Sequence, residues 1–449
     1  MEDFARTSAN LKVSPAELSP SDKEGFLSKQ GGKLIKQWQK RYFVLKGTLL
    51  YWFKEKDDKE AAGCISISNS SVCPQPKVKD HCFGIFQTER KPYFLACENE
   101  QEVDEWIAYL SKSEKVKVSI DDFDMLAVVG KGSFGKVMQV RKRDSGDIYA
   151  LKVLRKDAIM QKNQVKQTQS ERAILQRVQH PFIVSLQFAF QSEDKLYMVM
   201  DYVNGGELFF HLQKQGRFSE SRVRLYTAEI VLAIEHIHAM DIAYRDLKPE
   251  NILLDSEGHI KITDFGLSKE LEKDQTNTFC GSPEYLAPEI LQGEGHGKEV
   301  DWWSLGTLVF EMLAGLPPFY SENVKVMYDQ ILHAELNFPA HFSAPARSLL
   351  AGFLTRTSSK RLGAGASDAE PIRGHPFFKG YDWQKVYKRG YTPEFVPKVK
   401  SDTDINNFDP MFTSEKAEDS FVEKSALGKA EETSFEGFTF VAPSNFNGK

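Results

Sequence analysis

The chain has 449 residues, and its 41% of hydrophobic and 27% of charged residues predict folded globular domains rather than a disordered or fibrous protein. Its net charge of −5 argues against a general affinity for nucleic acid, so any anion binding must be local. The five scattered cysteines form no CxxC pair, which argues against a zinc site and against a disulfide framework.

Residues 1–20 are polar and contain Pro15 and Pro20, and they predict a flexible leader. They lack the apolar core of a secretion signal, and no apolar run in the chain reaches the length of a membrane-spanning helix. Together with the cysteine usage, these features predict a reducing, cytoplasmic setting.

A small β-rich domain is predicted over residues 21–114. The segments GFLSKQ, RYFVLK, LLYWFK, GCISIS, CFGIFQ and YFLACE recur with turn residues between them, which predicts an antiparallel barrel or sandwich of about seven strands. The run closes in NEQEVDEWIAYLSKS, where Val103, Trp106, Ile107 and Leu110 fall on one helical face. The prediction is a β-barrel capped by one helix, followed by a linker over 115–122.

From residue 123 the pattern predicts an α+β domain that ends at 378. Strand-like MLAVVG, VMQVRK and IYALKVL come first, then a helix through SERAILQRV and the strand LYMVMDYV. Longer helical periods follow in SRVRLYTAEIVLAIEHI and DWWSLGTLVFEMLAG. A β-rich part followed by a helical part is the α+β pattern. Residues 379–449 carry little helical signal.

A glycine-rich stretch, GKGSFGKV, lies between the first two strand-like runs of this second domain. Glycines allow backbone N–H groups to approach phosphates closely, although an ordinary hairpin turn is an equal alternative. A strand follows the stretch, which argues against a dinucleotide-binding fingerprint, and no GK[ST] follows to make a P-loop. The candidate phosphate-binding residues are Gly130, Lys131, Gly132, Ser133, Phe134, Gly135, Lys136 and Val137.

Four further patterns decide between these alternatives. Lys152 in IYALKVL and Glu171 in SERAILQRV are a candidate pair, although each alone could be a solvated surface charge. The stretch YRDLKPEN then places Asp246, Lys248 and Asn251 at fixed offsets, and DFG and APE follow it. Glycine loop, AxK, RDLKPEN, DFG and APE in this order are the protein-kinase signature set, and a chance match to all five is negligible.

Residues 123–378 therefore resemble a complete eukaryotic protein kinase, and the resemblance implies the following roles. Asp246 orients the substrate hydroxyl and accepts its proton, while Lys248 steadies the γ-phosphate of ATP. Asn251 and Asp264 hold Mg²⁺, and Lys152 paired with Glu171 positions the α- and β-phosphates. The other residues implied at the nucleotide site are Met200, Asp201 and Val203 at the adenine hinge, Glu207 at the ribose, and Ala150 and Phe408. Glu289 and Arg361 match a structural ion pair.

The activation segment resembles that of the AGC group of kinases. TNTFCGSPEYLAPE carries Thr278 where this group is phosphorylated, with Arg245 as the implied partner of the phosphate. Tyr244 stands where many kinases have His, but tyrosine is common in this group. An ordinary loop threonine is the alternative interpretation of Thr278.

The tail stretch SFEGFTF, residues 434–440, matches the AGC hydrophobic motif F-x-x-F-[ST]-[FY]. The resemblance implies that Phe435 and Phe438 dock in a groove of the small lobe beside the helix of Glu171. Phosphate on Thr439 would favour this docking. Ser420 in EDSFVE is a further candidate phosphosite, since the usual Thr-Pro turn site is missing.

Three acids suggest the substrate class. Glu207, Glu250 and Glu311 match positions that in basophilic AGC kinases receive substrate arginines, and carboxylates suit bidentate guanidinium contacts. We therefore expect Ser/Thr targets with Arg at −3 and also at −5. The alternative is that these acids serve folding, above all Glu311 inside an apolar helix.

Residues 29–41, KQGGKLIKQWQKR, contain five cations and no acid. A solvated basic hairpin is one interpretation, but the surrounding KEGFLSKQGGKLIKQWQKRYFVL resembles a pleckstrin homology (PH) domain that binds 3-phosphorylated inositol lipids. The resemblance implies Lys29, Lys36, Arg41 and Tyr51 as headgroup ligands. Gln39 stands where such domains often have a basic residue, which leaves the choice between bis- and trisphosphate lipids open.

The whole order, a PH-type β-barrel, a bilobal kinase fold and an extended AGC C-terminal tail over 379–449, resembles the protein kinase B family of Akt or RAC-type kinases. The resemblance implies a monomeric, cytoplasmic enzyme that phosphoinositides recruit to the plasma membrane downstream of phosphoinositide 3-kinase. Upstream kinases would phosphorylate Thr278 and Thr439. Two alternatives stay open: an AGC kinase of the ribosomal-S6 or serum-kinase type with a PH module, and an inert lipid-binding scaffold.

Overall fold

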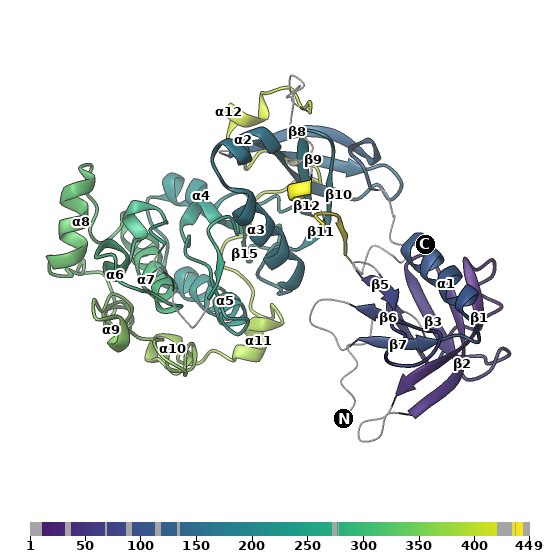
Figure 1. Ribbon diagram of the computed structural model, residues 1–449. Coiled ribbons are helices and arrows are strands. Elements are labelled where there is room, and N and C mark those ends of the chain that lie inside the picture. The colour runs from purple at the N-terminus through teal and green to yellow at the C-terminus, as the bar shows by residue number, and fades with distance from the viewer. Residues whose placement is uncertain are drawn as a thin grey trace. The chain divides into compact units, whose positions relative to one another are not determined.

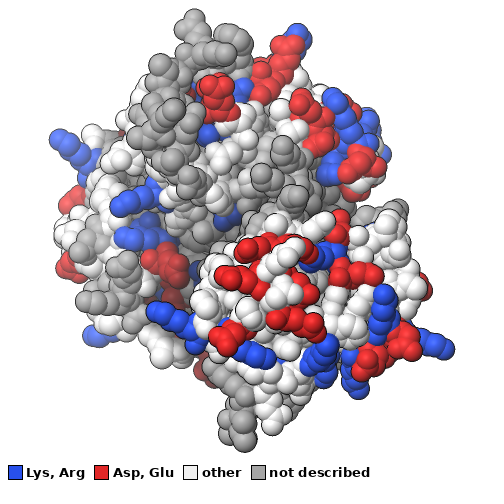
Figure 2. Space-filling view, turned by 45° about the vertical axis from the view of Figure 1, so that its right-hand side comes forward, with Lys and Arg blue, Asp and Glu red and all other residues white. Residues whose placement is uncertain are grey.

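The computed structural model describes residues 11–31, 37–67, 70–86, 92–112, 118–132, 135–271, 276, 278–419, 433–435 and 437–442. The chain divides into two compact units, residues 1–119 with 439–449 and residues 120–438, and each is described by itself (Figure 1). Within the described ranges no helix combines the length and apolar character needed to cross a bilayer. Both signs of charge occur on the face shown in Figure 2, in keeping with 58 Lys and Arg and 63 Asp and Glu residues.

The first unit contains a seven-stranded antiparallel sheet with one helix, as the sequence predicted. The sheet order is β4-β3-β2-β1-β7-β6-β5. The elements are β1 (Lys23–Gly31), β2 (Gln37–Lys46), β3 (Leu49–Phe53), β4 (Gly63–Ser66), β5 (Ser71–Pro74), β6 (Cys82–Phe86), β7 (Tyr93–Ala96) and α1 (Glu100–Lys112). The short strand β5 was not among the segments picked out from the sequence.

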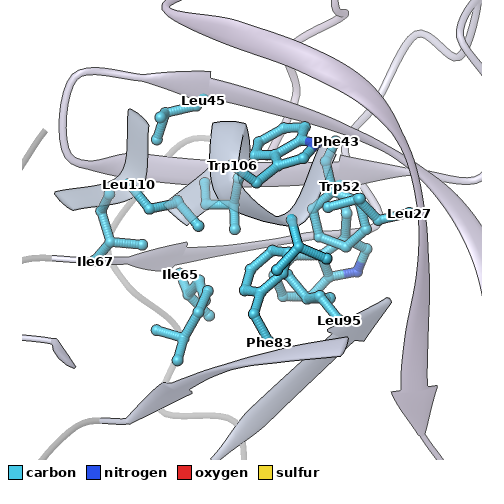
Figure 3. Packing of buried hydrophobic residues seen from close by; sticks show 13 residues of the cluster. Leu27, Phe43, Leu45, Trp52, Ile65, Ile67, Phe83, Leu95, Trp106 and Leu110 are labelled. Carbon is cyan, nitrogen blue, oxygen red and sulfur yellow. The ribbon is translucent and has the colours of Figure 1, made fainter. Parts of the chain in front are cut away.

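One face of this sheet and helix α1 enclose the core of the first unit (Figure 3). Trp106 and Leu110 of α1 lie among Phe43, Trp52 and Phe83 from the strands, and all five are buried. Alternating strand residues supply this core because successive side chains point to opposite faces of a sheet. The closing helix is therefore fixed by the apolar face that the sequence predicted.

The other face of the sheet carries a second apolar cluster, and the leader contributes to it. Leu18 is buried with Tyr42, Val44, Tyr51 and Phe53, and the partly buried Leu11 and Val13 pack against them. The backbone N–H of Ala61 donates to the carbonyl of Leu11 at 2.8 Å. The predicted flexible leader is wrong for residues 11–20, because its scattered apolar side chains cover this face. Residues 1–10 lie outside the described part.

The second unit begins with a small lobe in which five strands lie side by side in one sheet, in the order β11-β12-β10-β9-β8 (Figure 1). After the turn η1 (Ile120–Asp122), its elements are β8 (Phe123–Gly132), β9 (Gly135–Lys142), β10 (Ile148–Arg155), α2 (Lys156–Gln161), α3 (Val165–Arg177), β11 (Leu186–Gln191) and β12 (Lys195–Asp201). The buried stripe of α3, which includes Thr168, Glu171, Ile174 and Leu175, follows helical spacing.

The large lobe is mainly helical. Its helices are α4 (Leu208–Gln215), α5 (Glu220–His238), α6 (Pro288–Leu291), α7 (Glu299–Ala314), α8 (Val324–His333), α9 (Ala344–Phe353) and α10 (Glu370–Arg373). Short pieces link them: β13 (Ile242–Ala243) pairs with β16 (Lys269–Glu270), β14 (Ile252–Leu254) pairs with β15 (Ile260–Ile262), and η2 (Pro249–Asn251), η3 (Pro283–Tyr285), η4 (Ser358–Lys360) and η5 (Pro376–Phe378) are 3₁₀ turns.

Helices α5 and α7 form the centre of this lobe, because most of their residues are buried. A buried ion pair joins its later part to the activation segment. Arg361 donates from Nη1 and Nη2 to the two carboxylate oxygens of Glu289, at 2.6 and 2.8 Å. This bidentate geometry confirms the predicted Glu289–Arg361 pair.

In the described part of the tail after residue 378 the elements are short, in line with its weak helical signal: α11 (Trp383–Tyr387), α12 (Pro410–Thr413), the 3₁₀ turn η6 (Thr433–Phe435) and the strand β17 (Phe440–Val441). The carboxylates of Asp382 and Asp409 cap α11 and α12, respectively. Polar contacts with both lobes hold the tail. Arg389 forms an ion pair with Glu257 at 3.0 Å, for example, and the amide of Asn204 donates to the carbonyl of Ser401 at 3.3 Å.

Candidate functional site

Lys152 joins the small lobe to the large lobe. It lies on β10, and its Nζ is 2.6 Å from Oε1 of Glu171 on α3 and 3.3 Å from Oδ1 of Asp264 in DFG. Burial alone would lower the pKa of the Lys152 ammonium, but the charges of Asp264 and Glu171 outweigh burial and hold that pKa above its usual range. The structure thus brings three predicted site residues together around one fixed positive charge.

A second network surrounds Asp246, whose carboxylate is buried. Lys248 Nζ is 3.0 Å from its Oδ2, and the amide of Asn251 donates to the same oxygen at 2.8 Å. Ser282 donates to Oδ1 at 3.3 Å and accepts from Lys248 at 2.9 Å. Burial raises the pKa of the Asp246 carboxyl, although Lys248 and Asn251 favour its charged form. Ser282, from the activation segment, is a participant that the sequence analysis missed.

The loop that carries Asp246 is held by a buried carboxylate that the sequence analysis also missed. Asp301 of α7 accepts the backbone N–H groups of Tyr244 at 2.8 Å and Arg245 at 2.7 Å. His238 lies between Asp301 and Asp368 at 2.8 and 2.9 Å, and their charges and hydrogen bonds overcome its burial and raise its pKa to about 9. The protonated His238, which contacts both Asp301 and Asp368, therefore orients the Asp301 carboxylate, and this carboxylate in turn fixes the backbone of the loop that carries Asp246.

Asn251 and Asp264 fit the predicted magnesium site in their chemistry. The charge of Lys152 lowers the pKa of the Asp264 carboxyl, so this group is ionised at neutral pH. Asn251 donates its amide N–H groups to Asp246, which leaves its carbonyl oxygen as a ligand. No cluster of three or more His, Cys, Asp or Glu in the described ranges could hold a metal. A site with two protein oxygen ligands, from Asn251 and Asp264, suits Mg²⁺, because this ion completes its coordination shell with water and phosphate oxygens.

The glycine-rich stretch forms the hairpin between β8 and β9. Lys131 is paired with Lys136, and Gly132 with Gly135, while Ser133 and Phe134 lie outside the described residues. A Cβ on Gly135 would come within 1.8 Å of the carbonyl oxygen of Val153 on β10. The hairpin therefore lies so close to the neighbouring strand that only glycine fits at this position. The other predicted members, Gly130 and Val137, pair one step further from the tip.

The predicted hinge residues Met200, Asp201 and Val203 lie at the end of β12 and just beyond it. Ala150 of β10 is paired with Met200, and Val203 is buried just beyond the strand. The Asp201 carboxylate accepts from the backbone N–H of Ser185 at 3.2 Å and from the side chain of Gln187 at 2.7 Å, so it braces the strand end. The tail reaches the same place, because Phe408 stacks on Tyr202 with ring centroids 5.9 Å apart.

The predicted arginine-binding acids interact although they differ in exposure: Glu207 is partly buried, Glu250 is exposed and Glu311 is buried. Burial and then the charge of Glu250 raise the pKa of Glu207 to about 7, and burial also raises the pKa of Glu250. Glu284, which the sequence analysis missed, adds to the repulsion on Glu250. Glu311 is different, since it is buried in α7, accepts a hydrogen bond from the hydroxyl of Tyr285, and has its pKa raised by burial to about 7.

Thr278 is exposed, and its hydroxyl oxygen is 3.2 Å from that of Thr276, to which Lys269 donates at 2.8 Å. Arg245 is buried nearby and donates from Nε to the carbonyl of Leu267 at 2.9 Å. Its buried Nη1 has no hydrogen-bond partner in the part of the chain that the structure describes. Burial raises the pKa of the Cys280 thiol, two residues after Thr278, and the nearby charge of Arg245 partly offsets this rise. The candidate phosphosite and its predicted partner therefore share one neighbourhood.

The aromatic end of the tail docks beside α3. Phe435 is 0% and Phe438 is 3% exposed. Gln169 of α3 donates to the carbonyl of Ser434 at 2.6 Å, and Arg172 of α3 donates to that of Phe438 at 3.1 Å. The two donors flank Glu171 in the sequence, so the docking site predicted for these phenylalanines is confirmed. Thr439 is exposed, and Ser420 lies outside the described residues.

In the first unit, Lys29 and Arg41 lie on the paired strands β1 and β2. Lys29 is opposite Gln39, and Arg41 is opposite Leu27. The Lys29 ammonium lies 3.7 Å from the ring centroid of Trp52, and burial and then the charge of Arg41 lower its pKa to about 8. Two of the four predicted lipid ligands are thus close together, and Lys36 lies outside the described residues.

Tyr51 is not brought to this place. Leu50 and Trp52, on either side of it in β3, point into the core, so Tyr51 points to the opposite face. There it packs with Tyr42 and Val44, and burial raises the pKa of its hydroxyl to about 12. The structure therefore contradicts the prediction of Tyr51 as a headgroup ligand, because strand alternation turns it away from Lys29 and Trp52.

Comparisons with known proteins agree with this architecture. The family model of the protein kinase domain matches residues 123–378, that of the PH domain residues 21–115, and that of the protein kinase C terminal domain residues 399–440. The chain is 49% identical to a RAC family serine/threonine-protein kinase homolog of Dictyostelium discoideum over 444 residues, which is 95% of this chain and 98% of that protein.

Two further relatives are similar over different lengths. Protein kinase 2 of Dictyostelium discoideum is 61% identical over 333 residues, covering 74% of this chain and 69% of the relative. RAC-beta serine/threonine-protein kinase B of Xenopus laevis is 40% identical over 444 residues, covering 88% of this chain and 91% of the relative.

Proposed function

We propose that this chain phosphorylates arginine-containing proteins after recruitment by a phosphoinositide. The chain belongs to the protein kinase family. It is an AGC serine/threonine-protein kinase with a PH domain and is related to the RAC kinases. The contact of Lys152 with both Glu171 and Asp264 carries the proposal. Protein kinases need the Lys–Glu pair and the DFG aspartate in place together, and this chain holds both around one ammonium.

Each residue of the site has a part in this proposal. Asn251 and Asp264 would hold Mg²⁺, which would neutralise charge on the phosphate oxygens of ATP, the donor of the phosphoryl group. Asp246 orients the substrate hydroxyl and takes its proton, and its buried carboxylate is a better base than a solvated one because its pKa is raised. Lys248, fixed between Asp246 and Ser282, steadies the phosphate.

Substrate arginines would bind at Glu207 and Glu250. Burial raises the pKa of both carboxyls, and the charge of Glu250 raises that of Glu207 further, so a guanidinium between them would favour their charged forms. Glu311 is the weakest of the three candidates for direct contact, because the Tyr285 hydroxyl already occupies its carboxylate in the interior of α7. The proposed targets therefore carry arginine at −3 and also at −5.

A pair of peptides, RxRxxS and AxAxxS, tests both the activity and this preference on the chain phosphorylated at Thr278. At pH 8 we expect the arginine peptide to be phosphorylated with a KM at least about tenfold lower. The pKa of Glu207 is raised to about 7, so its carboxylate is ionised above that pH and protonates as the pH falls through it. The KM advantage should therefore shrink between pH 8 and pH 6.

The ratio of the two KM values at each pH removes the pH dependence of the chemical step, which both peptides share. Arginine in the peptide does not titrate in this range, so a change in the ratio reports groups on the kinase. Equal KM values for the two peptides at pH 8 would refute the substrate class. Absence of phosphate transfer to either peptide would refute the activity itself.

The proposed lipid site uses Lys29, Lys36 and Arg41. Burial and then the charge of Arg41 lower the pKa of Lys29, and an anionic headgroup would offset the repulsion between these two cations. Recruitment would bring the enzyme from the cytoplasm to the plasma membrane, and 3-phosphorylated inositol lipids would link it to phosphoinositide 3-kinase.

Charge reversal tests the lipid site. We expect Arg41→Glu to weaken binding to vesicles with 3-phosphorylated inositol lipids at least about tenfold, since each cation near an anionic surface contributes about 1 kcal/mol. Lys40→Glu is the matched control, because Lys40 is the next residue on β2, points to the other face and pairs with Glu98 at 3.3 Å. Vesicle co-sedimentation that falls equally for both variants, or for neither, would contradict the assignment.

Phosphorylation of Thr278 and Thr439 by upstream kinases would activate the enzyme. The exposure of Thr278 and the orphaned Nη1 of Arg245 support the first site, since a phosphate accepts several charge-assisted hydrogen bonds. The exposure of Thr439, next to the docked Phe438, supports the second. Ser420 is kept as a further candidate phosphosite on its sequence alone.

A further inference from the structure

Two lysines face each other at the neck of the β8–β9 hairpin. Lys131 and Lys136 are directly paired across the two strands, one step before the Gly132–Gly135 pair. Like charges directly opposite each other destabilise an antiparallel pair. This hairpin therefore carries a repulsion next to the backbone that is to cradle the phosphates, and something must offset it.

Glu415, from the tail, lies between these two lysines. Its Oε1 is 2.5 Å from Nζ of Lys131, and its Oε2 is 3.3 Å from Nζ of Lys136. One carboxylate thus accepts from both strands of the hairpin, with 28% of its side chain exposed. The hydrogen bond from Lys131 is the largest cause that lowers the pKa of Glu415, so the group is ionised at neutral pH.

The tail is anchored on both sides of Glu415. Before it, Phe408 stacks on Tyr202 at the end of β12, and the Tyr202 hydroxyl donates to the carbonyl of Asp404 at 3.0 Å. After it, Asp419 accepts from Lys195 at 2.6 Å and from the hydroxyl of Tyr197 at 2.9 Å. The backbone that presents Glu415 is therefore held against the small lobe independently of the hairpin.

We propose that Glu415 is a positioning residue for phosphoryl transfer, which pairs with both Lys131 and Lys136 and thereby holds the glycine-rich hairpin in register over the nucleotide phosphates. The proposal rests on the proposed function, because the hairpin matters only if it binds ATP. It assigns to the tail carboxylate a task at the nucleotide site although Glu415 does not itself contact the nucleotide.

Removal of the carboxylate has two opposing effects on nucleotide binding. It releases the hairpin, which loosens the phosphate cradle, but it also leaves two cations unneutralised near the phosphates, which would attract ATP. If Glu415 is a positioning residue, the first effect is the larger. The sign of the change in affinity therefore decides between positioning and mere charge compensation.

The test uses the full chain with Glu415→Gln, and Glu418→Gln as the control. Glu418 is exposed and its ion pair is with Lys416, in the tail itself, so its loss does not touch the hairpin. For Glu415→Gln we expect the Kd of a Mg²⁺-bound non-hydrolysable ATP analogue and the KM for ATP to rise about two- to fivefold, as for other partly exposed ion pairs. The kcat should change little, because the lost interaction binds substrate and transition state alike.

Backbone hydrogen exchange in the absence of nucleotide gives a second readout. Amides of residues 135–140 should exchange faster in Glu415→Gln and unchanged in Glu418→Gln. The charge-swapped pair Lys131→Glu with Glu415→Lys restores opposite charges across the neck and should recover the protection of these amides.

An unchanged or tighter Kd in Glu415→Gln, with unchanged exchange, would overturn the proposal while leaving the kinase activity intact. If the unmodified chain bound no nucleotide at all, the proposed function would fail instead, and the exchange rates would still decide whether Glu415 holds the hairpin.

Discussion

Asp246→Asn is expected to lower kcat for peptide phosphorylation by about 10²–10⁴-fold, the usual contribution of a general base. The amide keeps the shape of the side chain and one oxygen that can accept from Asn251 or Ser282, so the loop should keep its fold. What it loses is the negative charge that takes the hydroxyl proton and pairs with Lys248 at 3.0 Å. The affinity for the ATP analogue should therefore change much less than kcat.

Asp241→Asn is the matched control, since Asp241 lies in the same lobe, is exposed and pairs with Lys298 at 2.7 Å. Its kcat should stay within about twofold, as expected for a surface ion pair. Both variants are to be measured with Thr278 phosphorylated. An unchanged kcat of Asp246→Asn would contradict the catalytic assignment, whereas a variant without kinase activity that kept its full biological activity would favour the alternative of a lipid-tethered scaffold.

The site residues that were predictable from the sequence are those in contiguous motifs. RDLKPEN and DFG encode their chemistry by residue type and offset, and the structure indeed gathers Asp246, Lys248 and Asn251 in one network. Ser282, Asp301 and Glu415 could not be found in this way. Each acts on a partner that is distant in sequence, so only the fold brings a serine, a helix carboxylate or a tail carboxylate to its place.

The sequence predicted the strands of the first unit but misjudged what covers them. Alternation identified Leu50, Tyr51 and Trp52 as one strand, yet it could not say which face each residue would share with Lys29. A family resemblance alone placed Tyr51 at the lipid. In the leader, Leu11, Val13 and Leu18 are too sparse to give a periodic signal, and their burial depends on an apolar outer face that exists only once the sheet has formed.

The docking of the aromatic tail end is the second strong determinant of activity in our proposal. Burial of a phenylalanine side chain contributes about 1.5–3 kcal/mol, offset by the cost of ordering the tail. The gain is coupled to the active site, because the same helix α3 that donates from Gln169 and Arg172 to the tail presents Glu171 to Lys152. A tail that leaves its groove removes the support on one side of this ion pair.

We expect the double variant Phe435→Ala with Phe438→Ala to lower peptide kinase activity at least about tenfold even with Thr278 phosphorylated, since two lost burials exceed the 1.4 kcal/mol that corresponds to a factor of ten. Val396→Ala is the control, because Val396 is an apolar tail residue that is 50% exposed. A synthetic peptide of residues 431–442, added in excess, should restore part of the activity by filling the empty groove. Rescue of this kind separates docking from a general loss of stability, which an added peptide would not repair. An unchanged rate in the double variant would show that burial of the two rings does not control the Lys152–Glu171 pair.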